Sequence, residues 1–176
     1  MKVVLFDLDD TLTDRQLSFG AFVPVFQKEY SQHLGPCDTE RIDQAIITAD
    51  RGGYRPKSEF FGELCQILPW LNRPSPDKLE SFWRAHFGNC TIERPGARQL
   101  LVDLRSAGFR LAIITTGTAA MQNSKIHRLG LVTLVDAVLI SETIGVKKPN
   151  AEIYNKAMQA LASENSSALF VGDHPI

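Results

Sequence analysis

The feature that most constrains this chain is a short apolar run, Val3 to Phe6, that ends abruptly at three carboxylates, Asp7, Asp9 and Asp10. An unbroken apolar run of this length is typical of a strand buried on both faces of a parallel sheet. Ligands of open α/β sheets bind outside the carboxyl ends of the strands, so the carboxylates stand where a ligand is expected. Because neighbouring carboxylates repel one another, the cluster favours a hard divalent cation with oxygen ligands.

The last part of the chain alternates between the two regular patterns. Further short apolar runs at 111–114, 137–140 and 168–171 predict three more strands. Apolar residues at helical spacing predict three helices between them. The first carries the stripe Ala97, Leu100, Leu101 and Leu104 and is ended by Gly108, the second runs from about 118 to 129, and the last is capped by Asn150. This alternation predicts an α/β fold with a doubly wound, Rossmann-like parallel sheet.

A different pattern interrupts this alternation directly after the first strand. Four apolar stripes at helical spacing occupy residues 19–30, 42–49, 60–68 and 79–87. Pro24 is expected to kink or delay the first of these helices. Residues 15–93 are therefore predicted to form an inserted helical bundle.

Polar groups follow each predicted strand. Thr115-Thr116-Gly117 follows the second strand, Lys148 lies in a loop after the third, and Asp173 follows the last. In a parallel sheet these groups gather with Asp7 and Asp9 at one edge. Carboxylates, an ammonium and a hydroxyl in one place suit metal-assisted phosphoryl transfer, which depends on positioning and charge neutralisation.

Four stretches in this order resemble the motifs of the haloacid dehalogenase-like hydrolases, a superfamily of aspartate-nucleophile phosphatases. Residues 7–11 resemble motif I (DxDxT), 113–117 motif II, 146–149 motif III and 170–173 the opening of motif IV. The helical insertion falls where subfamily I members carry a C1 cap. The resemblance implies a catalytic core of residues 1–14 and 94–176 and a helical cap of residues 15–93.

The resemblance also implies roles for the acidic residues. Asp7 is expected to attack phosphorus and form an aspartyl phosphate. Asp9 is expected to protonate the leaving oxygen and then to deprotonate the hydrolytic water. A Mg²⁺ ion is expected between a carboxylate oxygen of Asp7, the backbone carbonyl of Asp9 and Asp173. Asp10 is expected to shape the turn, and His174 to neighbour the metal without binding it.

The remaining roles concern the phosphate. The Thr115 hydroxyl and the backbone N–H groups of Thr116 and Gly117 are expected to hold its oxygens. Lys148, chosen over Lys147 because the family's lysine directly precedes proline, is expected to neutralise charge on the phosphate and on the nucleophile. Taken singly, Thr115 is better explained as a strand-end hydroxyl and Lys148 as a solvated loop lysine, and Asp173 is also compatible with a helix N-cap.

Composition narrows the class of protein. The formal net charge of −1 does not create the positive electrostatic field that attracts a nucleic acid, so we expect no nucleic-acid partner. No apolar run is long enough to cross a membrane. Three widely separated cysteines fit a reducing compartment, so we expect a cytoplasmic protein. The sequence leaves its oligomeric state open between a monomer and a homodimer. The sequence ends soon after Asp173, so we expect the core to be truncated relative to the family pattern.

The sequence therefore predicts a Mg²⁺-dependent phosphatase of a small phosphorylated metabolite, a nucleotide or a sugar phosphate. A phosphomutase of the same superfamily, and a non-catalytic protein that binds a phosphate ligand, remain alternatives. Substrate specificity is expected in the helical insertion, where the segment 51–55 (Arg-Gly-Gly-Tyr-Arg) is either a substrate-facing basic loop or an ordinary turn between helices. Thr13, Asp14 and Arg15 are further candidates at the entrance to the site.

Overall fold

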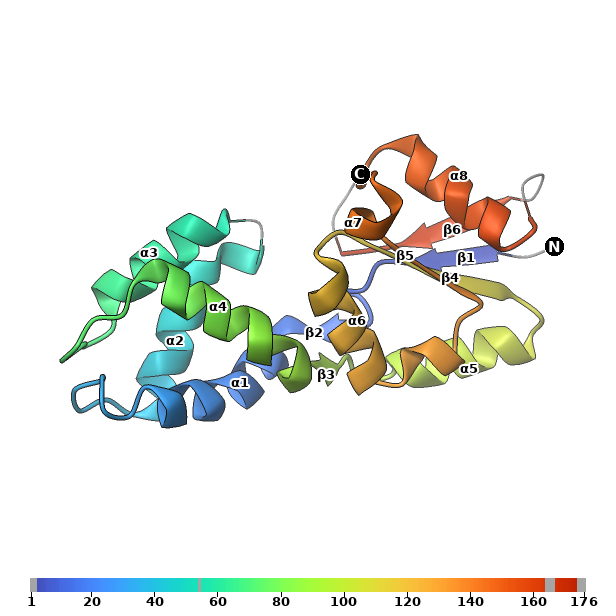
Figure 1. Cartoon of the computed structure of the whole chain (residues 1–176). Coiled ribbons are helices and arrows are strands. Elements are labelled where there is room, and N and C mark those ends of the chain that lie inside the picture. The colour runs from blue at the N-terminus through green and yellow to red at the C-terminus, as the bar shows by residue number, and fades with distance from the viewer. Residues whose placement is uncertain (1–2, 54, 164–166, 174–176) are drawn as a thin grey trace. The chain divides into compact units, whose positions relative to one another are not determined.

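The computed structural model describes residues 3–53, 55–163 and 167–173. The chain divides into two compact units, which are drawn in Figure 1. One unit, here called the α/β unit, combines Met1–Arg15 with Thr91–Ile176. The other, here called the helical unit, is Gln16–Cys90.

The α/β unit is built on a parallel sheet. Among the described residues the sheet has four strands, β1 (Val3–Phe6), β4 (Arg110–Thr115), β5 (Ala137–Ile140) and β6 (Ala168–Val171). Their order is β5-β4-β1-β6, and every neighbouring pair is parallel. The predicted doubly wound α/β fold is confirmed. Because the chain adds β4 and β5 on one side of β1 and β6 on the other, the switch in strand order lies at β1, where such folds bind ligands.

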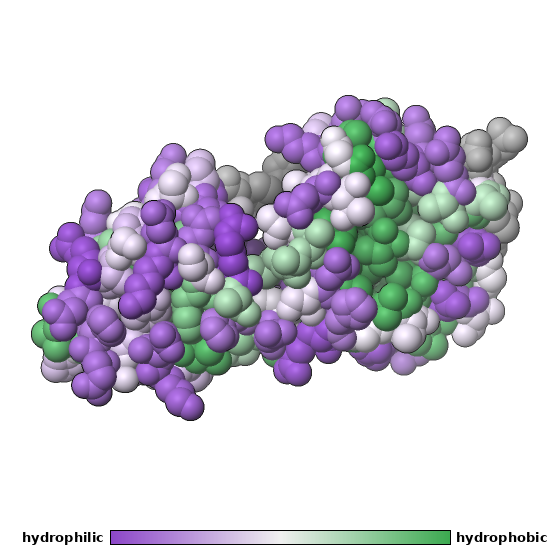
Figure 2. Space-filling model, in the orientation of Figure 1, coloured by the Kyte–Doolittle hydropathy of each residue, from purple (hydrophilic) through white to green (hydrophobic). Residues whose placement is uncertain are grey.

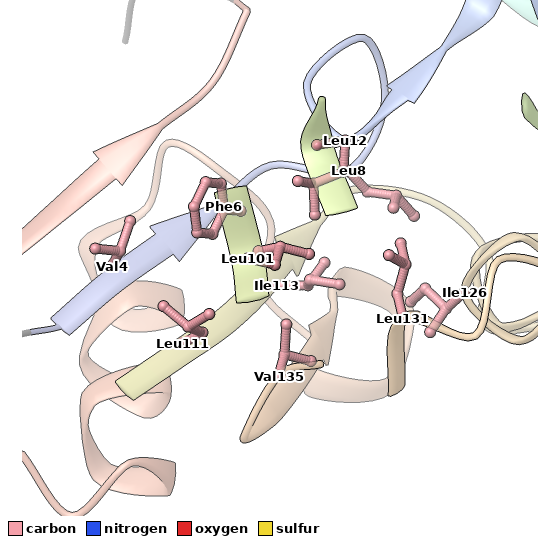
Figure 3. Close-up of a cluster of buried hydrophobic side chains, with 11 residues drawn as sticks. Val4, Phe6, Leu8, Leu12, Leu101, Leu111, Ile113, Ile126, Leu131 and Val135 are labelled. Atoms are coloured by element: carbon pink, nitrogen blue, oxygen red, sulfur yellow. The ribbon is translucent and has the colours of Figure 1, made fainter. Parts of the chain in front are cut away.

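Alternate residues of the central strands serve two separate cores. Side chains on one face of the sheet pack with α5 (Ala97–Ser106) and α6 (Ala119–Arg128), as the close-up in Figure 3 shows. This core consists of Val4, Phe6, Leu8, Leu12, Ala97, Leu101, Leu111, Ile113, Ile126, Leu131 and Val135. Leu131 comes from a short 3₁₀ helix, η3 (Leu131–Thr133). The alternation follows from the two-residue repeat of a strand.

The opposite face of the sheet packs on α8 (Ala151–Ala160). This second core consists of Val3, Leu5, Ala112, Ile114, Leu139, Ile153, Ala157 and Leu161. The unbroken apolar runs of β1 and β4 thus reflect burial on both faces, as the sequence predicted. The edge strand β6 is more open: Leu169 is 62% exposed, and Figure 2 shows hydrophobic side chains at the surface on this side of the sheet.

The helical unit contains α1 (Arg15–Glu29, which begins in the α/β unit), α2 (Thr39–Asp50), α3 (Lys57–Ile67) and α4 (Pro76–His86). Two 3₁₀ segments, η1 (Arg51–Gly53) and η2 (Phe87–Cys90), follow α2 and α4.

Aromatic side chains fill the core of the helical unit. The Phe22 ring lies 4.9 Å from the Trp83 ring, and Trp83 stacks on Phe87 at 3.9 Å. The expected delay at Pro24 is wrong, because α1 begins at Arg15 and continues through the proline.

The sequence patterns did not predict the shortest helices and strands of the α/β unit. Two-residue strands, β2 (Thr13–Asp14) and β3 (Ile92–Glu93), pair antiparallel within the α/β unit. A single helical turn, α7 (Ser141–Ile144), follows β5 where only a loop was expected. Leu100, predicted to be part of an inward stripe, is 47% exposed. In the described part of the chain, no helix is both long and apolar enough to cross a membrane.

Candidate active site

The chain makes a tight turn directly after β1. Leu8 is fully buried in the core, and its carbonyl accepts hydrogen bonds from the N–H groups of Leu12 and Thr13, each at 3.0 Å. Asp10 takes a left-handed backbone conformation with φ of +54°, and its Oδ1 accepts a hydrogen bond from the Arg15 N–H at 3.2 Å. Asp10 therefore shapes the turn, while the anchored Leu8 fixes the residues on either side.

Asp7 lies at the carboxyl end of β1 in a largely buried position. Its N–H donates to the Val171 carbonyl at 2.8 Å, which joins the ends of β1 and β6. Its Oδ1 accepts the Leu8 N–H at 2.7 Å and pairs with Lys148 Nζ at 2.6 Å. Burial raises the pKa of Asp7, and the contacts with Lys148 and Leu8 offset part of that rise.

Lys148 reaches this position from the segment before α8. Asn150 caps the helix, with its side chain accepting the Glu152 N–H at 2.9 Å as predicted. The Lys148 ammonium lies 5.4 Å from the centre of the Phe170 ring, and its side chain is only 16% exposed. The preceding Lys147 is exposed. The structure therefore places Lys148, and not its neighbour, against the expected nucleophile.

Asp9 contacts a different element. Lys125 Nζ lies 2.6 Å from its Oδ1, and Gln122 Nε2 donates to its Oδ2 at 2.9 Å, both from α6. Burial alone would raise the pKa of Asp9, but the Lys125 ammonium and the Gln122 amide outweigh it, and the pKa is lowered. The partners of Asp9 thus come from α6, which packs on one face of the sheet, whereas the partner of Asp7 comes from the segment that leads into α8, which packs on the other face.

Sequence reasoning missed Gln122 and Lys125. The prediction of a helix from about 118 to 129 was close to the observed α6, but no role was given to its polar residues. Both residues are buried together with Ile126, on the face that packs toward the sheet. Polar residues at i and i+3 on the inward face of a helix were the available signal, because that stripe is normally apolar.

The segment after β4 carries the expected phosphate-binding groups. Thr115 is buried, and its Oγ accepts a hydrogen bond from Gln122 Nε2. The following Thr116 is exposed. The Gly117 N–H donates to the Ser141 hydroxyl at 3.1 Å, a partner that the sequence did not predict. Gly117 has φ of +157°, and a Cβ there would lie 3.0 Å from Gln122, so the position suits glycine.

The expected oxygen donors for a cation lie at the ends of β1 and β6. Asp173 follows β6, and a Cβ on the preceding Gly172 would lie 3.6 Å from the Asp7 Cβ. The charge of Asp173 contributes, after burial, to the raised pKa of Asp10. In the described ranges no group of three or more His, Cys, Asp or Glu side chains is arranged to hold a metal ion.

The expected donor set contains only two carboxylates and is completed by one backbone carbonyl, so it does not require three such side chains. Asp7, Asp173 and the carbonyl of Asp9 are all hard oxygen donors, and their chemistry fits Mg²⁺. His174 lies outside the described residues.

The segment 51–55 was the candidate specificity loop. The Arg55 guanidinium contacts Glu59 at 3.4 Å, donates to the Ala49 carbonyl at 3.1 Å and pairs with Glu63, and its side chain is 13% exposed. Arg51 ends α2 in a left-handed conformation. Arg55 is thus engaged within the helical unit, which favours the ordinary turn. Tyr54 lies outside the described residues.

The fold and the strand-end constellation define a hydrolase of the haloacid dehalogenase-like type. The sequence profile of the haloacid dehalogenase-like hydrolases matches residues 1–175, so the chain belongs to this family.

Curated relatives include several phosphatases. Glyceraldehyde 3-phosphate phosphatase of Pyrococcus abyssi is 33% identical over 98% of this chain and 73% of its own length. Ribulose-1,5-bisphosphate 5-phosphatase of Halopiger xanaduensis is 29% identical over 97% of this chain and 75% of its own. The pyrimidine 5′-nucleotidase YjjG of Escherichia coli is 41% identical over 59% of this chain and 47% of its own.

Solved structures share the fold. The magnesium-bound HAD-hydrolase YfnB of Bacillus subtilis superposes with a TM-score of 0.72 at 22% identity, covering 98% of this chain and 78% of that one. A β-phosphoglucomutase from Thermotoga maritima gives a TM-score of 0.70 at 22% identity, covering 97% and 75%.

Proposed function

We propose that this chain is a Mg²⁺-dependent phosphatase that hydrolyses a small phosphorylated metabolite through an aspartyl phosphate on Asp7. The observation that carries the proposal is the ion pair of 2.6 Å between Lys148 Nζ and Asp7 Oδ1 at the end of the central strand. The ammonium keeps a largely buried carboxylate available as a nucleophile. Curated relatives that span nearly the whole chain, named as phosphatases of glyceraldehyde 3-phosphate and ribulose bisphosphate, favour a short phosphorylated sugar as substrate.

In the first step, a carboxylate oxygen of Asp7 attacks phosphorus and the bond to the leaving oxygen breaks. The Leu8 N–H and Lys148 both contact Oδ1, so we assign Oδ2 to the attack. Asp9 gives its proton to the leaving oxygen. The lowered pKa of Asp9 describes the protein without substrate, and the negative charge of a bound phosphate favours protonation of this carboxyl.

In the second step, water attacks the phosphorus of the aspartyl phosphate. Asp9, now a carboxylate, accepts the proton of that water, and the bond between phosphorus and Asp7 breaks. The Thr115 hydroxyl and the adjacent backbone hold phosphate oxygens throughout. Asp7, Asp173 and the carbonyl of Asp9 would hold Mg²⁺. When bound, the ion would offset the negative charge of the phosphate and the carboxylates.

The helical unit is proposed as the cap that selects the substrate. Its position in the chain, inserted between β2 and β3, supports this assignment.

The proposal is tested by measuring phosphate release with and without Mg²⁺. The panel begins with D-glyceraldehyde 3-phosphate and adds a pentose phosphate, a pyrimidine nucleotide and p-nitrophenyl phosphate. Wild type is expected to release phosphate only with Mg²⁺, and Asp7→Asn to release none. Asp103→Asn, which alters an exposed carboxylate on α5, is the matched control and should match wild type. Equal release by Asp7→Asn and wild type would reject the proposal.

A further inference from the structure

Helix α6 brings two buried polar side chains to the candidate active site. Gln122 is 1% exposed and Lys125 is 4% exposed. Gln122 Nε2 donates to Asp9 Oδ2 at 2.9 Å and also to the Thr115 hydroxyl. Lys125 Nζ lies 2.6 Å from Asp9 Oδ1. Buried groups of this kind are costly to desolvate, so their concentration at one carboxylate calls for an explanation.

The chemistry of the Gln122 amide determines how the Thr115 hydroxyl is used. An amide nitrogen carries two protons and accepts no hydrogen bond. The Gln122 amide donates one of these protons to Asp9 and the other to the Thr115 hydroxyl, so the Thr115 oxygen is the acceptor of that hydrogen bond. The proton of that hydroxyl must then point to a different acceptor. A phosphate oxygen at the expected binding position is an acceptor of the required kind.

The Asp9 carboxylate is held but still open. Gln122 and Lys125 each take one lone pair on a different oxygen, and a carboxylate has about four such positions. The Asp9 side chain is 34% exposed, whereas the Lys125 side chain is buried. Gln122 and Lys125 therefore hold the Asp9 carboxylate from its buried side, and lone pairs remain on its solvent-exposed side for proton exchange.

The helix itself is firmly placed. Thr118 caps α6, its Oγ accepting the Met121 N–H at 3.4 Å, and Ile126 is buried in the core beneath the sheet. Gln122 and Lys125 are three residues apart and so share one face of the helix. Their donor groups are thus fixed by the same packing that fixes the sheet.

We infer that Gln122 and Lys125 are positioning residues for the proposed phosphatase reaction. They hold the Asp9 carboxyl where it meets the leaving oxygen, and Gln122 turns the Thr115 proton toward the phosphate. In the step that depends on this geometry, the O–H bond of Asp9 breaks and its proton moves to the leaving oxygen as the bond from phosphorus to that oxygen breaks. The inference rests on the proposed function, because it assigns both residues to that same site.

The test compares two leaving groups in Lys125→Met and Gln122→Met. The nitrophenolate of p-nitrophenyl phosphate leaves without a proton, whereas the alkoxide of glycerol phosphate needs one. For each variant, kcat/KM for the alkyl ester is expected to fall about 10²-fold, and kcat/KM for the aryl ester less than about tenfold. The matched controls are Lys156→Met on α8, where the side chain is 40% exposed, and Gln99→Met at an exposed position of α5, and both should leave the two values unchanged.

A double-variant cycle shows whether Lys125 acts through Asp9. In an Asp9→Asn background, Lys125→Met is expected to change kcat/KM for the alkyl ester less than about twofold, because the group it positions is already lost. If Lys125→Met fails to fold, Gln122→Met carries the same comparison of leaving groups. An equal loss for both esters, no loss, or a full additional loss in the Asp9→Asn background overturns the inference. If the wild-type protein hydrolyses neither ester, the proposed function is overturned, and this inference is overturned with it.

Discussion

Lys148 Nζ lies 2.6 Å from Asp7 Oδ1, although the two residues are 141 positions apart in the sequence (148 − 7). Lys148→Met should lower kcat/KM about 10²–10³-fold, because a positioned charge that stabilises the reacting groups is lost. Lys147→Met, which changes the exposed neighbour, should retain wild-type activity. Steady-state kinetics of both variants test this assignment. A large loss of kcat/KM in Lys147→Met with wild-type activity in Lys148→Met would show that the wrong lysine is assigned.

Two adjacent leucines on α5 should differ sharply in their effect on stability. Leu101 is fully buried under the sheet, and Leu100 is 47% exposed. Leu101→Ala should reduce the free energy of unfolding by about 2–5 kcal/mol, whereas Leu100→Ala should change it by about 0.5 kcal/mol or less. Urea unfolding followed by far-UV circular dichroism measures both. Similar losses in the two variants would contradict the observed orientation of α5.

Ionisation of Tyr30 should make the helical unit less stable at alkaline pH. Burial raises the pKa of its phenol from 10.0 to about 12. The folded chain therefore keeps the proton that the unfolded chain releases. Its contribution is fully present below pH 10 and is lost as the pH rises through about 12.

Tyr30→Phe should remove up to about 2 kcal/mol of this alkaline loss in stability. Urea unfolding at pH 9 and at pH 11.5, followed by tryptophan fluorescence, measures the difference. Trp70 and Trp83 both belong to the helical unit, so their signal reports on it. An identical alkaline loss in wild type and Tyr30→Phe would contradict the assignment.

Tyr154 should tolerate loss of its hydroxyl. Within the described residues this buried oxygen has no hydrogen-bond partner, and the ring packs edge-on against Phe170 at 5.3 Å. Tyr154→Phe keeps the ring and removes an unsatisfied polar group, so the free energy of unfolding should stay equal or rise by up to about 1 kcal/mol. Thermal unfolding tests this. A clear loss of stability would show that the hydroxyl has a partner in solution.

The sequence was sufficient for the sheet because all four strands read as unbroken apolar runs, and the central strands β1 and β4 are buried on both faces. It also predicted that Lys148 and Asp7 lie at one edge of the sheet, since parallel strands bring their carboxyl ends together. The choice of Lys148 over Lys147 as the partner of Asp7 came from the resemblance to the family. The course of α1 through Pro24 and the exposure of Leu100 were not predictable, because local preference yields to packing against neighbouring elements.

The partners of Asp9 were missed for a related reason. Gln122 and Lys125 are 113 and 116 residues from Asp9, and the contact exists only once α6 lies on the sheet. The hydrogen bond from Gly117 to Ser141 likewise depends on the placement of α7 directly after β5. Side-chain pairing between elements distant in sequence is therefore what the sequence pattern alone left open.

The most direct test of the central claim is to trap the covalent intermediate. The enzyme is quenched during turnover of its best substrate and treated with borohydride, which reduces an acyl phosphate to an alcohol. Peptide mass spectrometry should then find homoserine at position 7 in wild type, and no such conversion without substrate. Phosphate release with residue 7 unmodified, or with the modification at another carboxylate, would contradict Asp7 as the nucleophile.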